Sequence, residues 1–213
     1  LWLDTIDQEG WEECWASGPT QSGKTLTCFV IPILYHLFER QENVVLGLPT
    51  MDMFADKWLI DIRPVIESSF RHMLPSSGSG SRGGKIKDAI VFKNGAVLKP
   101  MTPEGDDSRR AAFTTRVVSI TEANDFGGVS STSEEGQTQL DQLRGRMGAF
   151  GELTGMRRRL YGECTVSTED GVIWRQIENG TKGEIYTRCV CCATWVLVER
   201  QHLVGWQEAE SGE

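Results

Sequence analysis

The segment Gly18-Pro19-Thr20-Gln21-Ser22-Gly23-Lys24-Thr25 constrains this chain more than any other stretch of its 213 residues. It matches the pattern G-x-x-x-x-G-K-[ST] at every fixed position. In that pattern, backbone N–H groups turn toward a phosphate, and the following helix presents its positive end to the same anion. Lys24 is then expected to contact the outer phosphates, and the Thr25 hydroxyl to be a ligand for Mg²⁺. A chance match in roughly 200 start positions has a probability below about 1%, so we expect all eight residues to bind a nucleoside triphosphate.

The pattern around this segment predicts alternating strands and helices. A short strand over about 14–17 is expected before the loop, and a largely apolar helix over about 24–40 after it. Further strands are expected over 44–48, 116–121 and 160–168, with helices over about 51–70 and 138–150 and a hairpin about Lys93-Asn94-Gly95. The predicted fold is α/β of the P-loop NTPase type, with a mostly parallel central sheet flanked by helices. The expected domains are 1–180 for the nucleotide-binding domain and 181–213 for a small β-rich appendage.

An acidic element must act with the phosphate loop in any hydrolase, and the segment RVVSITEANDF supplies the best candidate. We expect its apolar run to lie in the sheet beside the first strand, and Glu122 to orient and deprotonate a water that attacks the γ-phosphate. An aspartate usually precedes this glutamate and holds the metal, but here the residue is Thr121. Three readings follow: the hydroxyl substitutes, Asp125 reaches the metal, or the activity is weak.

A cation near the γ-phosphate is also needed to balance the developing charge. Arg109 and Arg110 lie in a polar stretch shortly before the acidic strand and are the preferred candidates for a sensor or an arginine finger. Other basic residues are weaker candidates, since most arginines on a surface are solvated; they are Lys99, Arg116, Arg144 and Arg146.

Charge and cysteine content limit the remaining classes of function. With 22 basic and 30 acidic side chains the net charge is −8, so any contact with DNA must be local rather than an extensive wrapping of the duplex. No secretory signal opens the sequence, and the longest apolar stretch, 26–38, is too short to cross a bilayer. Six cysteines without a disulfide framework fit a reducing cytosol. Cys189 and Cys192 form one Cys-x-x-Cys pair, which is half of a zinc ribbon, so zinc is not expected.

The order of several motifs resembles the ATPase domain of phage terminase large subunits, in particular the lambda-type, GpA-like branch. These motifs are GPTQSGKT, VVLGLPT opening a tryptophan-bearing helix, RVVSITEANDF, ECTVSTEDG and the Cys-x-x-Cys pair. The resemblance implies an additional-strand, catalytic-glutamate ATPase that hydrolyses ATP with Mg²⁺. It also implies that Thr165, Ser167 and Thr168 form a coupling motif that reports hydrolysis to the DNA-gripping part.

The same resemblance implies the biological setting. The partners are double-stranded DNA, the small terminase subunit and the portal protein, in the cytoplasm of a bacterial host and without a membrane. A homo-oligomer is expected on the capsid, and a monomer is open for the isolated domain. The nuclease domain of these proteins is expected to be missing, so the chain is interpreted as an excised domain or a truncated gene product.

Two other functions stay open on the sequence alone. One is a different nucleic-acid-dependent ATPase, such as a helicase-like remodeller, because the LPT segment at 48–50 resembles a helicase motif that touches a nucleic-acid strand. The other is a catalytically weak nucleotide-binding remnant, which Thr121 motivates.

Overall fold

The computed structural model describes residues 2–8, 10–75, 89–102, 113–126, 133–151, 155–169 and 171–197. The chain divides into two compact units, Leu1–Ile177 and Glu178–Glu213. The larger unit carries the central sheet and is described first.

Six strands form the central sheet in the described part of this unit, in the order β1-β6-β5-β2-β4-β3. Five of them run parallel, and β3 pairs antiparallel with β4 at one end of the sheet. Their bounds are β1 Glu13–Ser17, β2 Val44–Gly47, β3 Ile90–Val91, β4 Val97–Met101, β5 Val117–Thr121 and β6 Arg159–Cys164. The predicted α/β class with a mostly parallel sheet is therefore confirmed.

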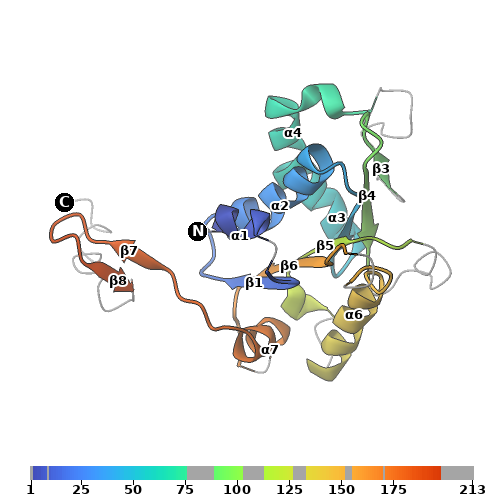
Figure 1. The fold of residues 1–213 in the computed structure, drawn as a ribbon. Helices are drawn as coiled ribbons and strands as arrows, with labels where there is room; N and C mark the ends of the chain where they lie inside the picture. Colours follow the sequence, from blue (N-terminus) through green and yellow to red (C-terminus); the bar gives the residue numbers. More distant parts are fainter. Residues whose placement is uncertain are drawn as a thin grey trace. The chain divides into compact units, whose positions relative to one another are not determined.

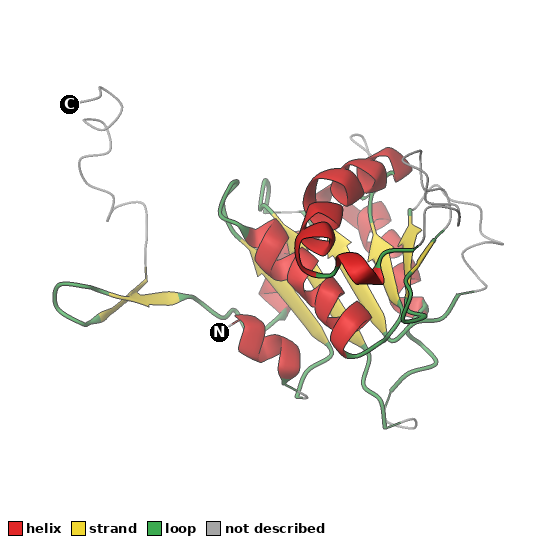
Figure 2. Ribbon diagram, turned by 90° about the horizontal axis from the view of Figure 1, so that it is seen from above, coloured by secondary structure: helices red, strands yellow, loops and turns green. Residues whose placement is uncertain are grey.

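Helices cover both faces of this sheet (Figures 1 and 2). Those that precede β3 lie over one face, and their apolar side chains form one core with Val44, Leu46 and Tyr161. The helices that follow β5 lie against the other face, where Leu140, Leu143 and Ile173 pack on Val45 and Val118. Alternate residues of one strand thus enter different cores, as the pleat of a strand requires.

The first face is covered by α1 and by two longer helical segments. Their bounds are α1 Trp2–Asp7; then η1 Thr25–Val30, α2 Ile31–Leu34 and η2 Tyr35–Glu39; then α3 Met51–Lys57, η3 Trp58–Ile62 and α4 Arg63–Ser69, followed by the short turn η4 Arg71–Met73. The second face is covered by α6 Ser133–Gly145 and α7 Val172–Asn179, with the turn η5 Ala123–Asp125 just after β5. None of the helices in the described ranges is long and apolar enough to cross a membrane.

Each long helical segment contains a proline shortly after a π-helical turn, in which the N–H groups bond five residues back instead of four. In η1 the Ile31 N–H donates to Leu26 O, and in η3 the Arg63 N–H donates to Trp58 O, both five residues back. Pro32 and Pro64 follow directly and have no N–H to donate. A wider turn before each proline relieves the crowding of its ring with the preceding turn, so both helices continue rather than break.

Several local expectations are confirmed. Thr50 caps α3, since its side chain accepts a hydrogen bond from Met53 N at 3.2 Å. The β3–β4 hairpin turns at Gly95, whose φ of +89° suits glycine. The stripe in the second helical segment is buried at Phe54, Trp58, Ile62 and Ile66.

One expectation about the sheet is wrong. β5 does not lie beside β1, because β6 lies between them and pairs in parallel with both. This inserted strand agrees with the additional-strand architecture that the sequence resemblance implies. The consequence is that residues of β6 separate the phosphate loop from the acidic strand.

A polar network ties the amino ends of the strands to the end of the phosphate-loop helix. The Glu42 carboxylate accepts from Arg116 Nε and Nη2, each at 2.7 Å, and lies 2.7 Å from His36 Nδ1. His36 Nε2 in turn is 2.8 Å from the buried Tyr161 hydroxyl on β6. These contacts fix η2, β5 and β6 relative to one another at the edge opposite the strand ends that carry the candidate site.

The second unit contains a two-stranded antiparallel hairpin, β7 Tyr186–Arg188 and β8 Trp195–Leu197. Its turn carries Cys189, Cys191 and Cys192, all free thiols. The Cys192 thiol lies 3.3 Å from Thr194 Oγ1, a hydrogen bond that lowers its pKa.

Candidate functional site

The loop from Gly18 to Lys24 connects β1 directly to the helix that begins at Thr25. Gln21 and Gly23 have φ angles of +60° and +79°, which turn the backbone sharply. Ser22 Oγ donates to Pro19 O at 2.8 Å, and the Thr27 hydroxyl donates to Gly23 O at 2.9 Å. The loop is therefore turned sharply, is held by its own hydrogen bonds and leads into the start of a helix, where backbone N–H groups favour an anion.

Lys24 points from this loop to the segment that follows β6. Its ammonium group donates to Thr165 Oγ1 at 2.9 Å and to Pro19 O at 3.3 Å. Thr165 is 141 residues further along the chain, so this hydrogen bond joins the phosphate loop to the expected coupling motif.

Glu122 stands at the end of β5 in a left-handed conformation, with φ 53° and ψ 46°. Non-glycine residues adopt this conformation at a cost of about 1 to 2 kcal/mol, and such residues concentrate at functional sites. Its carboxylate lies 3.8 Å from Lys57 Nζ on α3, and the Cys164 thiol donates to Glu122 Oε2 at 3.9 Å. Glu122 is thus held at the sheet edge with its side chain partly exposed.

The phosphate loop and Glu122 lie at the same edge of the sheet. Lys24 donates a hydrogen bond to Thr165, and Cys164, which directly precedes Thr165 in the chain, donates one to Glu122. Because the strands are parallel, their carboxyl ends meet at this edge, where ligands bind in such sheets. β6 brings the two segments together although it keeps their strands apart.

Asn124 joins the turn after Glu122 to the expected coupling motif. Its Nδ2 donates to Thr165 O at 3.1 Å and to Ser167 Oγ at 3.2 Å, while its Oδ1 accepts from Ile173 N at 3.1 Å. Thr168 is exposed, and its carbonyl accepts from Gly171 N at 3.3 Å. Of the three expected coupling residues, Thr165 and Ser167 therefore contact the site directly.

A carboxylate that the sequence analysis did not identify lies within this site. Glu163 is 1% exposed and Thr121 is 0% exposed, and the Thr121 hydroxyl donates to Glu163 Oε1. Burial raises the pKa of Glu163, and the charge of Glu122 adds to this effect; the Thr121 hydrogen bond and the charges of Lys24 and Lys57 oppose it. One feature of the sequence pointed to Glu163: it lies within a predicted, largely apolar strand, and a glutamate is almost never fully buried unless it has a partner.

The other candidate residues of the sequence analysis differ in how far the structure places them. Asp125 is exposed on η5, where its N–H donates to Glu122 O at 3.0 Å. Arg109 and Arg110 fall outside the described residues. Arg116 pairs with Glu42, and Arg144 pairs with Glu13 at 2.6 Å.

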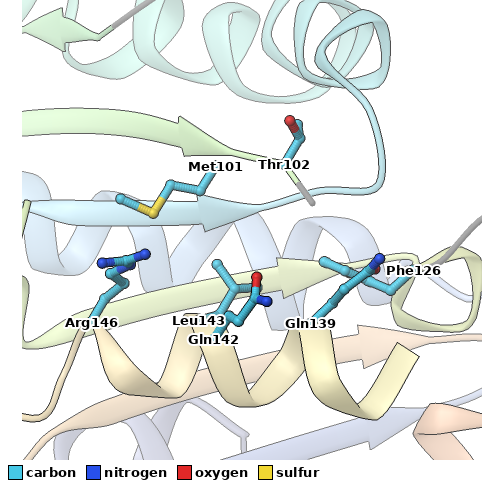
Figure 3. Close-up of a pocket in the computed structure, with 7 residues that line it drawn as sticks. All are labelled: Met101, Thr102, Phe126, Gln139, Gln142, Leu143 and Arg146. Carbon is cyan, nitrogen blue, oxygen red and sulfur yellow. The ribbon is translucent and has the colours of Figure 1, made fainter. Parts of the chain in front are cut away.

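A small cavity lies apart from these residues, between the end of β4 and α6 (Figure 3). Its volume is about 10 Å³, room for a single water molecule. It is lined by Met101, Thr102, Phe126, Gln139, Gln142, Leu143 and Arg146. A space of this size does not hold a nucleotide.

The donor groups at the sheet edge fit Mg²⁺ better than zinc. Within the described ranges, no group of three or more His, Cys, Asp or Glu side chains is arranged to hold a metal ion. Mg²⁺ beside a nucleotide does not need such a cage, because it keeps several waters and takes one or two protein oxygens plus phosphates. The Thr25 hydroxyl and the buried Glu163 carboxylate are oxygens that could hold the ion in this way.

Comparison with known proteins identifies the family. No curated protein and no solved structure matches the chain. A family model described as "Phage terminase large subunit gpA, ATPase domain" matches residues 2–213. The resemblance inferred from motif order is confirmed by this match, and with it ATP as the nucleotide of the family. The chain belongs to the family of phage terminase large subunit gpA ATPase domains.

Proposed function

We propose that this chain binds ATP with Mg²⁺ in the loop 18–25, activates water with Glu122 and uses hydrolysis to move double-stranded DNA into a capsid. The proposal rests on one observation: Lys24 contacts Thr165, and Glu122 contacts Cys164, the residue next to Thr165 in the chain. Both groups needed for phosphoryl transfer, a cation for the phosphates and a carboxylate for water, thereby face one edge of the sheet.

Each residue has a distinct part in the proposed reaction. Backbone N–H groups of the loop and the ammonium of Lys24 bind the phosphates, and Lys24 exchanges its hydrogen bond with Thr165 for one with the nucleotide. Glu122 orients a water and accepts its proton. Thr25 and a carboxylate would hold Mg²⁺, which would supply positive charge next to the phosphate oxygens.

The link from ATP to DNA passes through the segment after β6. When Lys24 leaves Thr165, Asn124 still holds the Thr165 carbonyl and the start of α7. A change at the phosphates is therefore transmitted to a segment that also contacts the turn after Glu122. DNA, the small terminase subunit and the portal protein are the partners that the family implies, with Arg109 or Arg110 as candidate cations for the γ-phosphate.

Substitution of Glu122 by glutamine tests the proposal directly. Glu122→Gln keeps the shape but removes the base, so phosphate release should fall by at least about 100-fold while ATP binding stays within about twofold of wild type. Glu67→Gln, on the exposed side of α4 in an ion pair with Arg63, is the matched control and should hydrolyse ATP like wild type.

Three results discriminate the alternatives. Full activity of Glu122→Gln refutes the role of this residue. Phosphate release at background level from the wild-type chain, with and without double-stranded DNA, favours a nucleotide-binding remnant. ATP-dependent strand separation favours a helicase-like remodeller over a packaging motor.

A further inference from the structure

β5 ends in Thr121 where a carboxylate is expected, and a buried carboxylate, Glu163, lies on the neighbouring strand β6. Thr121 ends β5 at the position where P-loop ATPases carry the metal-holding aspartate. In the parallel pairing of β5 and β6, the residue directly opposite Thr121 is Glu163. The Thr121 hydroxyl donates to the Glu163 carboxylate, so the two side chains meet.

Glu163 also faces the correct side of the sheet. Tyr161, two residues earlier on β6, contacts His36 in the phosphate-loop helix. Because alternate residues of a strand point to the same face, Glu163 points to this helix as well. Its opposite neighbour on β1 is Ala16, two residues before the loop begins.

Among the described residues, no cation pairs with the Glu163 carboxylate. In the described part of the chain its carboxylate accepts from the Thr121 hydroxyl, and no basic side chain forms an ion pair with it. Lys24 and Lys57 influence it only at longer range, and burial raises its pKa. A buried carboxylate without a positively charged partner is costly, and a cation bound next to it lowers that cost.

We propose that Glu163 supplies the carboxylate that recognises the Mg²⁺ bound with the nucleotide, and that Thr121 is the positioning residue that orients it. In this proposal the metal-holding carboxylate lies on β6 rather than on β5, so Thr121 does not by itself indicate an inactive site. This inference rests on the proposed binding of ATP in the loop 18–25, and it assigns the metal to Glu163 rather than to Asp125.

The test measures metal binding separately from hydrolysis. A non-hydrolysable ATP analogue is titrated into the full chain by calorimetry, first with EDTA and then with Mn²⁺, and bound Mn²⁺ is counted by electron paramagnetic resonance. For Glu163→Gln we expect metal-free analogue binding within about twofold of wild type. The Mn²⁺ affinity of the chain–analogue complex should fall at least about tenfold, which is about 1.4 kcal/mol.

A second variant moves the carboxylate back to β5. In the double variant Thr121→Asp with Glu163→Gln, the charge is restored on the neighbouring strand, and Mn²⁺ affinity should recover to within about threefold of wild type. Recovery distinguishes a metal site from a merely structural role of Glu163. Asp125→Asn serves as the comparison and should leave Mn²⁺ affinity unchanged.

Each remaining outcome is decisive. Wild-type Mn²⁺ affinity in Glu163→Gln, or its loss in Asp125→Asn, overturns the assignment. Loss of metal-free analogue binding in both Glu163 variants shows that the residue is structural and also overturns it. If the wild-type chain does not bind the analogue at all, the proposed function fails, and this inference fails with it; wild-type binding with an unaffected Glu163→Gln overturns the inference alone.

Discussion

Removing the carboxylate of Glu42 should destabilise the protein by an amount that disappears at low pH. Burial raises the pKa of this residue, but the hydrogen bonds from His36 and Arg116 and the charge of Arg116 outweigh it, and the pKa falls from 4.5 to about 2. Each tenfold change in proton affinity corresponds to about 1.4 kcal/mol, so the ionised Glu42 contributes about 3 kcal/mol at neutral pH. Glu42→Gln should therefore lower the free energy of unfolding by about 3 kcal/mol at pH 7.

The sign of the pH dependence follows from the lowered pKa. Above the unfolded-state pKa, near 4.5, the contribution is complete, and it is lost as the pH falls toward the folded-state pKa of about 2. About half should be gone near pH 3. Burial is the main cause that lowers the pKa of His36 from its ordinary value of 6.5. The free energy of unfolding should therefore also fall in a separate pH range, as the pH drops below 6.5 and protonation of His36 favours the unfolded state.

Urea unfolding of wild type and Glu42→Gln at pH 7, 5, 4 and 3, followed by tryptophan fluorescence, measures this difference. Glu67→Gln breaks the exposed Arg63–Glu67 pair and should change the free energy of unfolding by no more than about 0.5 kcal/mol at any pH. A Glu42→Gln difference that stays constant from pH 7 to pH 3 would refute the reasoning, because it would not arise from the ionised carboxylate.

Three further substitutions test separate features. Thr165→Val removes the partner that Lys24 gives up on binding ATP, so ATP affinity should rise about threefold to tenfold in calorimetry; weaker binding would contradict the exchange. Gly162→Ala places a Cβ about 2.1 Å from the Trp15 ring, so the free energy of unfolding should fall by about 1–3 kcal/mol in urea titrations; an unchanged value would contradict the close packing. Thr50→Ala removes a helix cap and should cost about 1 kcal/mol in the same titrations, with an unchanged midpoint as the contrary result.

Local features of this protein were predictable from the sequence because their causes are local. The phosphate loop needs only its own glycines, lysine and hydroxyl, and the hairpin needs only Asn94 and Gly95. The cap at Thr50 likewise depends on the next three residues. The loop, the hairpin and the helix cap are each stabilised mainly by residues close to them in the sequence.

The position of β5 and the role of Glu163 were not predictable in this way. Strand order depends on which apolar faces pack together, and β6 lies about 40 residues beyond β5 in the sequence. Glu163 becomes a candidate site residue only because β6 pairs with β5 and places it opposite Thr121. No spacing within RVVSITEANDF or ECTVST alone records this pairing.

The insertion of β6 between β1 and β5 also determines how the loop 18–24 and Glu122 are linked through the sheet. β1, which leads into the loop 18–24, and β5, which leads into Glu122, share no ladder of backbone hydrogen bonds, and each shares one with β6. A displacement of β1 relative to β5 would therefore disturb one of these two ladders or move β6 as well. β6 leads directly into the segment before α7, so in the proposed ATPase a displacement of either strand would reach this segment through a strand rather than through a loop.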